Sequence, residues 1–246
     1  MKYSKGVSGS LIAVTLLLGG CATFDGIVTR SNTTPPKVEQ PIAPKGLLPS
    51  DPWQREALVL QAKPNRYQEE SALVNVPDSA KSRFAAGAQL LKQGKLDEAK
   101  SLYETMSQHY PALSGVWVQL GSIAEKQAHV EQAIAYLRQA INLQTSNYLA
   151  HNHLGLLYRQ QGKFSVALNH YNQALDSWPA FTQARLNRGI LYDLYLGEKE
   201  QALADYQVYQ ALLTQPDRKV KSWIADLERQ LQASNASSGS IKEDAL

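Results

Sequence analysis

Four glycines at a constant spacing constrain the fold of this chain more than any other feature of its sequence. Each lies 34 residues after the one before: Gly87, Gly121, Gly155 and Gly189. Alanines recur at the same interval, with one step of 35 residues: Ala99, Ala133, Ala167 and Ala202. Between these positions apolar residues return every three or four places, which is the period of amphipathic helices. The long period predicts an array of similar helical units, each packed on the next.

The residues around these glycines resemble the tetratricopeptide repeat (TPR), a helix-turn-helix unit of about 34 residues with the order W-x-x-L-G-x-x-Y, A-x-x-x-F and P. The stretches "WVQLG" and "LGLLY" carry the first part of this order. The resemblance implies an all-α fold, a right-handed TPR solenoid of about four repeats. We assign the repeats to residues 80–113, 114–147, 148–181 and 182–216.

Small residues in each unit have a physical role. The repeated glycine and alanine let the two helices of a unit approach closely, because a larger side chain would hold their axes apart. We expect the large residue four places after each alanine to fill the space between units. Gly94, Gly162 and Gly197 are expected to end first helices, where a positive φ favours glycine. Repeat four departs from the pattern with Arg188 and one extra residue.

A solenoid needs a cover for its last repeat, and residues 217–232 are suited to that role. Apolar residues fall on one helical face and charged residues on the other, the apolar ones being Val220, Trp223, Ile224, Leu227 and Leu231. This pattern predicts a capping helix. The small, polar residues 233–246 predict a disordered tail.

The N-terminus has the layout of an export signal. Lys2 and Lys5 precede an apolar run, which is too short for a permanent membrane span. The closing "LGGC" resembles the lipobox of bacterial lipoproteins, so we expect residues 1–20 to be removed and Cys21 to be lipidated. Ala22, where an inner-membrane lipoprotein tends to have Asp, favours the periplasmic face of the outer membrane. The alternative is a plain secretory signal that leaves Cys21 as a free thiol.

Residues 21–79 read as a lipidated cysteine followed by a linker. Eight of the 11 prolines lie here, and prolines at this density favour extended chain. One interruption, Asp51 to Ala62, has the apolar residues of a short helix. Such a helix either docks on the repeats or floats, and the sequence does not choose between these.

Charge and cysteine content exclude several classes of function. Loss of Lys2 and Lys5 with the signal lowers the formal charge from +3 to +1, which argues against a nucleic-acid partner. A single cysteine excludes an internal disulfide framework. The expected contacts are envelope proteins and a membrane reached through the lipid.

The TPR resemblance also implies a peptide-binding groove, because first helices line the concave side of such arrays. Transferring the groove positions to this sequence gives eleven candidates: Val118, Gln119, Ser122, Asn152, His153, Leu156, Arg159, Leu186, Asn187, Ile190 and Asp193. Relatives that capture a C-terminal carboxylate use paired Lys and Asn, but Phe84 and Ala88 stand at those places in repeat one. The apolar candidates favour a partly apolar peptide.

Gln119, His153 and Asn187 lie 34 residues apart, so we expect them to form a ladder along the groove. They either pair with a bound peptide backbone or hydrogen-bond to adjacent helices, since most side-chain hydrogen bonds serve structure.

Catalytic and metal chemistry find little support. His151 and His153 point to nearly opposite sides of a helix and are not expected to bind one ion; His151 stands where the repeat has Trp, and a packed ring is expected. The chain has no glycine-rich phosphate loop, Cys pair or nucleophile elbow. We therefore expect no catalytic residues, metal or cofactor.

The favoured hypothesis is a membrane-anchored, non-enzymatic adaptor of the cell envelope. By analogy with similar TPR lipoproteins it would organise cell-wall hydrolases or proteases. The alternatives are a pilotin-like factor for type IV pilus secretins, an accessory of TonB-type energy transduction, or an enzyme or glycan binder framed by the repeats.

Overall fold

The fold was analysed in a computed structural model that describes residues 49–72 and 75–243. All regular secondary structure in these two ranges is helical. The predicted signal peptide and Cys21 lie outside the described residues, as do residues 244–246.

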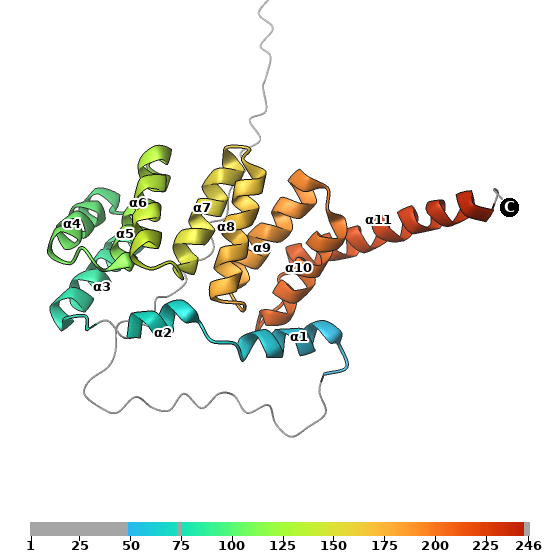
Figure 1. The fold of residues 1–246 in the computed structure, drawn as a ribbon, viewed down its shortest axis with the longest axis horizontal. Helices are drawn as coiled ribbons and strands as arrows, with labels where there is room; N and C mark the ends of the chain where they lie inside the picture. Colours follow the sequence, from blue (N-terminus) through green and yellow to red (C-terminus); the bar gives the residue numbers. More distant parts are fainter. Residues whose placement is uncertain (1–48, 73–74, 244–246) are drawn as a thin grey trace, which may run out of the picture.

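Paired helices form the body of the molecule (Figure 1). Each predicted repeat contains one pair: α3 (Asp78–Lys92) with α4 (Leu96–His109), α5 (Ser114–Lys126) with α6 (Val130–Leu143), α7 (Tyr148–Gln160) with α8 (Phe164–Ser177), and α9 (Thr182–Leu191) with α10 (Lys199–Leu212). Each second helix also packs on the first helix of the next pair, so the pairs stack into a solenoid. The predicted all-α TPR solenoid is confirmed.

Turns between the helices of a pair follow the predicted register. Gly94, Gly162 and Gly197 have φ of +77°, +72° and +70°, the left-handed conformation that glycine adopts at little cost. In repeat two Ala128 takes the equivalent place with φ of +60°.

The extra residue of repeat four is absorbed as a π-helical turn. This element, η1 (Tyr192–Leu196), continues α9 and is capped by Gly197. A π-helical turn holds one residue more than an α-helical turn. The pairing of α9 with α10 therefore survives a spacing of 35 residues.

The repeated glycines lie against the large residues that follow the repeated alanines. A Cβ at Gly155 would fall 2.5 Å from a ring carbon of Tyr171, and one at Gly189 would fall 2.7 Å from a ring carbon of Tyr206. These rings fill space within a repeat, between its own two helices. We expected these rings to fill the space between units, and this expectation was incomplete. Because glycine has no side chain, it leaves space on the first helix of the same unit, and the ring occupies that space.

Two further helices precede the repeats, where a linker was expected. They are α1 (Pro52–Gln61) and α2 (Arg66–Ala72), and with the adjoining described residues we call them the N-terminal strap (residues 49–72). The Asp51 carboxylate accepts a hydrogen bond of 2.8 Å from the Trp53 amide, and Pro52 occupies the first turn of α1, where its missing N–H costs nothing.

The strap runs along one edge of the row of helix pairs (Figure 1). Ala57 and Leu60 of α1 are buried with Val208 and Leu212 of α10. The assignment of all of residues 21–79 to a linker was thus wrong for the strap. Pro52 lies in the first turn of α1 and Pro64 lies between α1 and α2, and apolar residues of the two helices supply the packing.

On α2, Tyr67 packs on two repeats. Its ring meets Tyr148 edge to face at 5.7 Å, and its hydroxyl lies 3.3 Å from Ser114 Oγ. Gln144 donates a hydrogen bond of 3.1 Å to the Tyr67 carbonyl. The strap thereby connects the ends of successive repeats, and the Asp51 to Ala62 helix docks rather than floats.

The last helix, α11 (Arg218–Glu243), caps the array as predicted. Val220 and Leu227 are buried in one cluster with Tyr206, and the Trp223 ring lies 5.4 Å from the Tyr206 ring. The helix continues to Glu243, so residues 233–243 are helical and not the disordered tail that was predicted. Extending an existing helix costs far less than starting one, and residues 233–243 contain no proline.

Membrane-spanning segments were also sought. Within residues 49–72 and 75–243, every helix is too short or too polar to cross a bilayer.

Candidate functional site

The first helices of repeats two to four lie next to one another. Helix α7 packs against both α5 and α9, and the predicted groove positions fall on these three helices and η1. We call this surface the first-helix face. Eight of the eleven candidates are partly exposed on it: Gln119, Ser122, His153, Leu156, Arg159, Leu186, Ile190 and Asp193.

Three candidates are buried instead. Val118 is 3% exposed and belongs to the core cluster of repeats two and three, so its side chain is not presented to a ligand. Asn152 and Asn187 are each 7% exposed, and Asn187 donates a hydrogen bond of 2.9 Å to the Asn152 side-chain oxygen. This bond joins α7 to α9. The pair serves helix packing in this structure, because each amide is desolvated and needs a partner.

The predicted ladder is not continuous. His153 lies 2.9 Å from the Glu125 carboxylate, across from α7 to α5, while Asn187 bonds Asn152. Two of the three ladder residues therefore hydrogen-bond to adjacent helices, which is the second of the two roles that the sequence allowed, in place of pairing with a peptide backbone. Gln119 remains partly exposed.

Leu186 and Ile190 lie near the end of the array. Both pack against the cluster that contains Val220 and Leu227 of the capping helix. Part of the surface of these two side chains is thus covered by the capping helix α11. Leu156, in repeat three, is the apolar candidate that lies farther from this helix.

Sequence reasoning did not include among the candidates Leu194 and Tyr195 of η1, which continues α9, or Tyr171 of α8. Leu194 and Tyr195 of η1 are 68% and 47% exposed, and the Arg159 guanidinium lies 5.8 Å from the centre of the Tyr195 ring. The Tyr171 hydroxyl is buried without a hydrogen-bond partner among the described residues. The 35-residue spacing of repeat four was the available signal, because π-helical insertions are frequent at functional sites.

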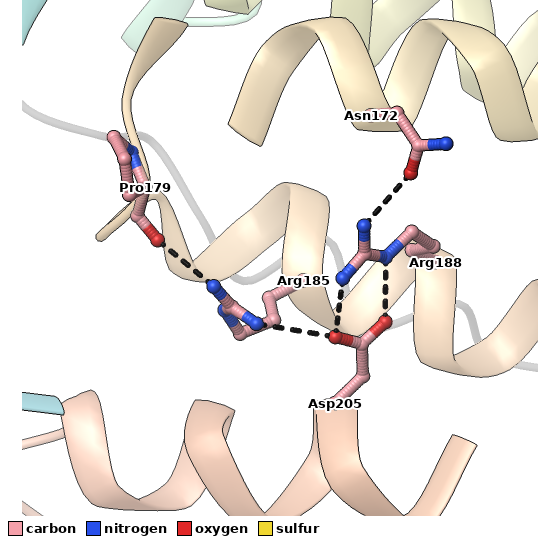
Figure 2. A network of polar contacts seen from close by, with 5 residues as sticks. All are labelled: Asn172, Pro179, Arg185, Arg188 and Asp205. Atoms are coloured by element: carbon pink, nitrogen blue, oxygen red, sulfur yellow. Dashed lines mark hydrogen bonds and ion pairs between the residues drawn. The ribbon is translucent and has the colours of Figure 1, made fainter. Parts of the chain in front are cut away.

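Arg188, noted as a departure from the repeat, belongs to a buried ionic network (Figure 2). Asp205, 3% exposed, accepts from Arg188 at 2.7 and 2.8 Å and from Arg185 at 3.3 Å. Arg188 also bonds Asn172, and Arg185 bonds the Pro179 carbonyl. Burial lowers the pKa of Arg185; for Arg188 the hydrogen bonds and charge of Asp205 outweigh burial and raise the pKa. The network joins repeat three to both helices of repeat four.

The two histidines of "HNH" have separate partners, as their spacing predicted. His151 is 6% exposed; its Nε2 lies 3.1 Å from the Thr145 carbonyl and its Nδ1 lies 3.1 Å from Nδ1 of His170. A carbonyl only accepts, so Nε2 of His151 donates and its Nδ1 accepts from His170. No group of three or more His, Cys, Asp or Glu side chains in the described ranges is placed to hold a metal ion.

This histidine pair predicts a loss of stability in acid. Burial, with the charges of His151 and Arg138 acting in the same direction, lowers the pKa of His170 to about 4; burial also lowers the pKa of His151. Because unfolded histidine binds its proton near pH 6.5, the stabilisation is complete above that pH and is lost as the pH falls toward 4. We expect the pair to account for a decrease of about 1–3 kcal/mol in the free energy of unfolding.

Urea unfolding at pH 7 and pH 4.5 measures this difference. Replacing His170 by Gln should shrink the pH dependence, whereas His129→Gln, at an exposed position, should leave it unchanged. An unchanged pH dependence in His170→Gln would contradict the assignment, since carboxylates then account for all of it.

The geometry defines the class of protein: a solenoid of helix pairs in which a glycine on each first helix receives a large side chain of the second. The chain carries tetratricopeptide repeats, whose family models match residues 114–147 and 154–215.

Solved structures share this fold. The chain is similar to pilF of Pseudomonas aeruginosa, with a TM-score of 0.58 and 17% identity over 63% of this chain and 70% of that one. It is also similar to MamA (41-end) of Desulfovibrio magneticus RS-1, with a TM-score of 0.54 and 15% identity over 69% and 94% of the two chains. At these identities the likeness concerns the fold alone.

One curated relative matches part of the chain. A probable biofilm formation methyltransferase, WspC of Pseudomonas putida, is 28% identical over 127 residues. The match covers 52% of this chain and 28% of the relative, so the chain spans little more than a quarter of that protein's length.

Proposed function

We propose that this protein is a non-enzymatic adaptor that holds one or more envelope proteins on the first-helix face of its TPR array. The observation that carries the proposal is the presence of partly exposed polar and apolar side chains, such as Ser122 and Leu156, at equivalent places on adjacent first helices. Repeats of this kind bind extended or helical protein segments on that side. A surface that mixes polar and apolar groups suits recognition of a peptide.

The proposal includes an anchor. The lipobox resemblance assigns a lipid to Cys21, which would hold the array at the periplasmic face of the outer membrane. Residues between Cys21 and the strap would then serve as the spacer. By analogy we assign the adaptor to the organisation of cell-wall hydrolases or proteases.

In-cell crosslinking tests this proposal. A photoreactive amino acid replaces Ser122 or Leu156 in the full chain, and mass spectrometry identifies the captured proteins. We expect one or a few envelope proteins, whose purified forms should bind the wild-type chain and bind Leu156→Asp more weakly. A hydrolase or protease would support the favoured role, whereas a secretin or a TonB-system component would replace it with one of the alternatives.

Two controls make the result decisive. The same amino acid at Val166, which is 40% exposed on α8, should not capture the same proteins. Cys21→Ser should move the protein from the membrane fraction to the soluble fraction. An unchanged distribution would contradict the proposed lipid anchor but would not bear on the adaptor function. Capture of only its own copies would contradict the adaptor.

A further inference from the structure

In repeats one, three and four a tyrosine lies on the repeated glycine, whereas Leu137 takes that place in repeat two; repeats one and four show how the tyrosine hydroxyl finds a partner. The Tyr206 ring lies on Gly189, and its hydroxyl donates a hydrogen bond of 3.3 Å to Asp193, four residues after that glycine. In repeat one the Tyr103 hydroxyl donates to the Phe84 carbonyl at 3.1 Å. Each of these hydroxyls is given an acceptor by the first helix of its own repeat.

Repeat three lacks such an acceptor. The Tyr171 ring lies on Gly155, and the residue four places after that glycine is Arg159, whose guanidinium can only donate. The Tyr171 side chain is 0% exposed, and neither its hydroxyl nor Nη1 of Arg159 has a hydrogen-bond partner in the described ranges. Burial raises the pKa of Tyr171 and the Arg159 charge acts against that rise, so the two groups are within electrostatic reach. The Tyr171 hydroxyl is inaccessible to a ligand, whereas the Arg159 side chain is partly exposed and can be reached from outside.

Neighbouring carboxylates are already engaged. Glu125 lies 2.9 Å from Nδ1 of His153, and Asp193 accepts from Tyr206. No ion pair joins Arg159 to an acid within the described part of the chain. Within the described residues Arg159 therefore lacks an anionic partner, and its charge is available to an anionic group of a bound molecule.

Exposed apolar groups lie beside this cation. The Tyr195 ring lies under the Arg159 guanidinium and 4.9 Å from the Phe164 ring, and Leu194 precedes it in η1. Leu194 is the most exposed large apolar side chain of the described residues. An exposed apolar group next to an unpaired cation suits a ligand that combines an apolar side chain with a carboxylate.

We propose that Arg159, Leu194 and Tyr195 form a subsite for a partner peptide in which Asp or Glu is adjacent to a large apolar residue. We call it the Arg159 subsite. It rests on the proposed adaptor function, since Arg159 belongs to the first-helix face, and it specifies the chemistry of the partner. It differs from the paired Lys and Asn arrangement for C-terminal carboxylates, because the carboxylate is a side chain and the donor is a single Arg.

Selection from a phage-displayed library of random 12-residue peptides tests the subsite. The full chain is immobilised, and a selected peptide is compared with its amide analogue, in which Gln or Asn replaces Glu or Asp. We expect selected peptides to be enriched in an acid beside Leu, Ile, Phe or Met. The amide analogue should bind about tenfold more weakly, which is the effect of losing a charged hydrogen bond.

Variants separate the contributions. Arg159→Gln should abolish the difference between acid and amide peptides, and Leu194→Ser should remove the apolar preference while the acid preference remains. Arg83→Gln, at an exposed position on α3, is the matched control and should behave as wild type. Circular dichroism confirms that each variant is folded.

The outcomes distinguish the subsite from the adaptor function. Peptides without an acid preference, or an acid preference that survives in Arg159→Gln, would overturn the subsite while Ser122 and Leu156 crosslinks still support the adaptor. Self-association that Arg159→Gln abolishes would assign the surface to a second copy and overturn the peptide assignment. If the wild type selects no peptide, the subsite is overturned. The adaptor function is overturned as well only if the Ser122 and Leu156 crosslinks also capture no partner.

Discussion

Gly155→Leu is expected to unfold the TPR array or separate its helices. A Cβ alone at this position would lie 2.5 Å from one carbon of the Tyr171 ring and within 3.0 Å of two others. That ring is fully buried between α7 and α8, so it cannot move aside without opening the core. Overpacking a well-packed core typically costs about 1–3 kcal/mol and occasionally more, and Leu adds several groups here, so we expect a loss at or above the top of this range. Thermal unfolding followed by circular dichroism measures the loss.

Gly155→Ala is a milder form of Gly155→Leu and should also destabilise the array, because it adds the Cβ that meets the Tyr171 ring. Gly115→Ala is its matched control. Both glycines lie in first helices, but a Cβ at Gly115 would lie 3.6 Å from its nearest neighbours, which is ordinary contact. Alanine favours a helix by up to about 1 kcal/mol over glycine, so Gly115→Ala should be neutral or stabilising. A stable, fully helical Gly155→Leu would contradict the register of the repeats.

The register of the repeats was predictable because it depends on contacts within one unit. Gly155 and Tyr171 are 16 residues apart and lie on helices joined by a short turn, so a repeated sequence pattern records their contact. The turn at Gly162 follows in the same way from its positive φ. Four copies of the pattern made each position readable despite substitutions.

The strap was not predictable in this way, because its contacts are long-range and occur once. Tyr67 packs on Tyr148, 81 residues further along the chain, and no repeat records that pairing. Pro64 and Pro77 suggested an extended linker, although they lie outside the helices of the strap. Local composition showed where helices stop and said little about what the intervening segments touch.

At the candidate site, positions were predictable but side-chain partners were not. The repeat pattern placed Asn152, Asn187 and Arg159 on the first-helix face. Whether each is free depends on its neighbour: the two amides bond each other, whereas Nη1 of Arg159 has no hydrogen-bond partner among the described residues. Such pairings depend on the rotamers of adjacent helices, which a single sequence does not specify.

Asp205→Ala is expected to lower the free energy of unfolding by about 3–5 kcal/mol, because it leaves two buried cations without their anion. Arg185 and Arg188 both bond this carboxylate, and the Asp205 side chain is 4% exposed (Figure 2). Water cannot replace the lost partner without opening the contact between α9 and α10. Chemical denaturation at pH 7 measures the change, which should be accompanied by increased amide exchange in these two helices.

Asp226→Ala provides the comparison that identifies burial as the cause. Asp226 also pairs with an arginine, at 2.9 Å from Arg229, but the two side chains are 55% and 76% exposed. Exposed pairs contribute at most about 1 kcal/mol, because water solvates each charge almost as well as the partner does. Equal losses in the two variants would contradict the role of the network. A large loss confined to Asp205→Ala would show that repeat four, which departs from the TPR pattern at Arg188, depends on that departure for its packing.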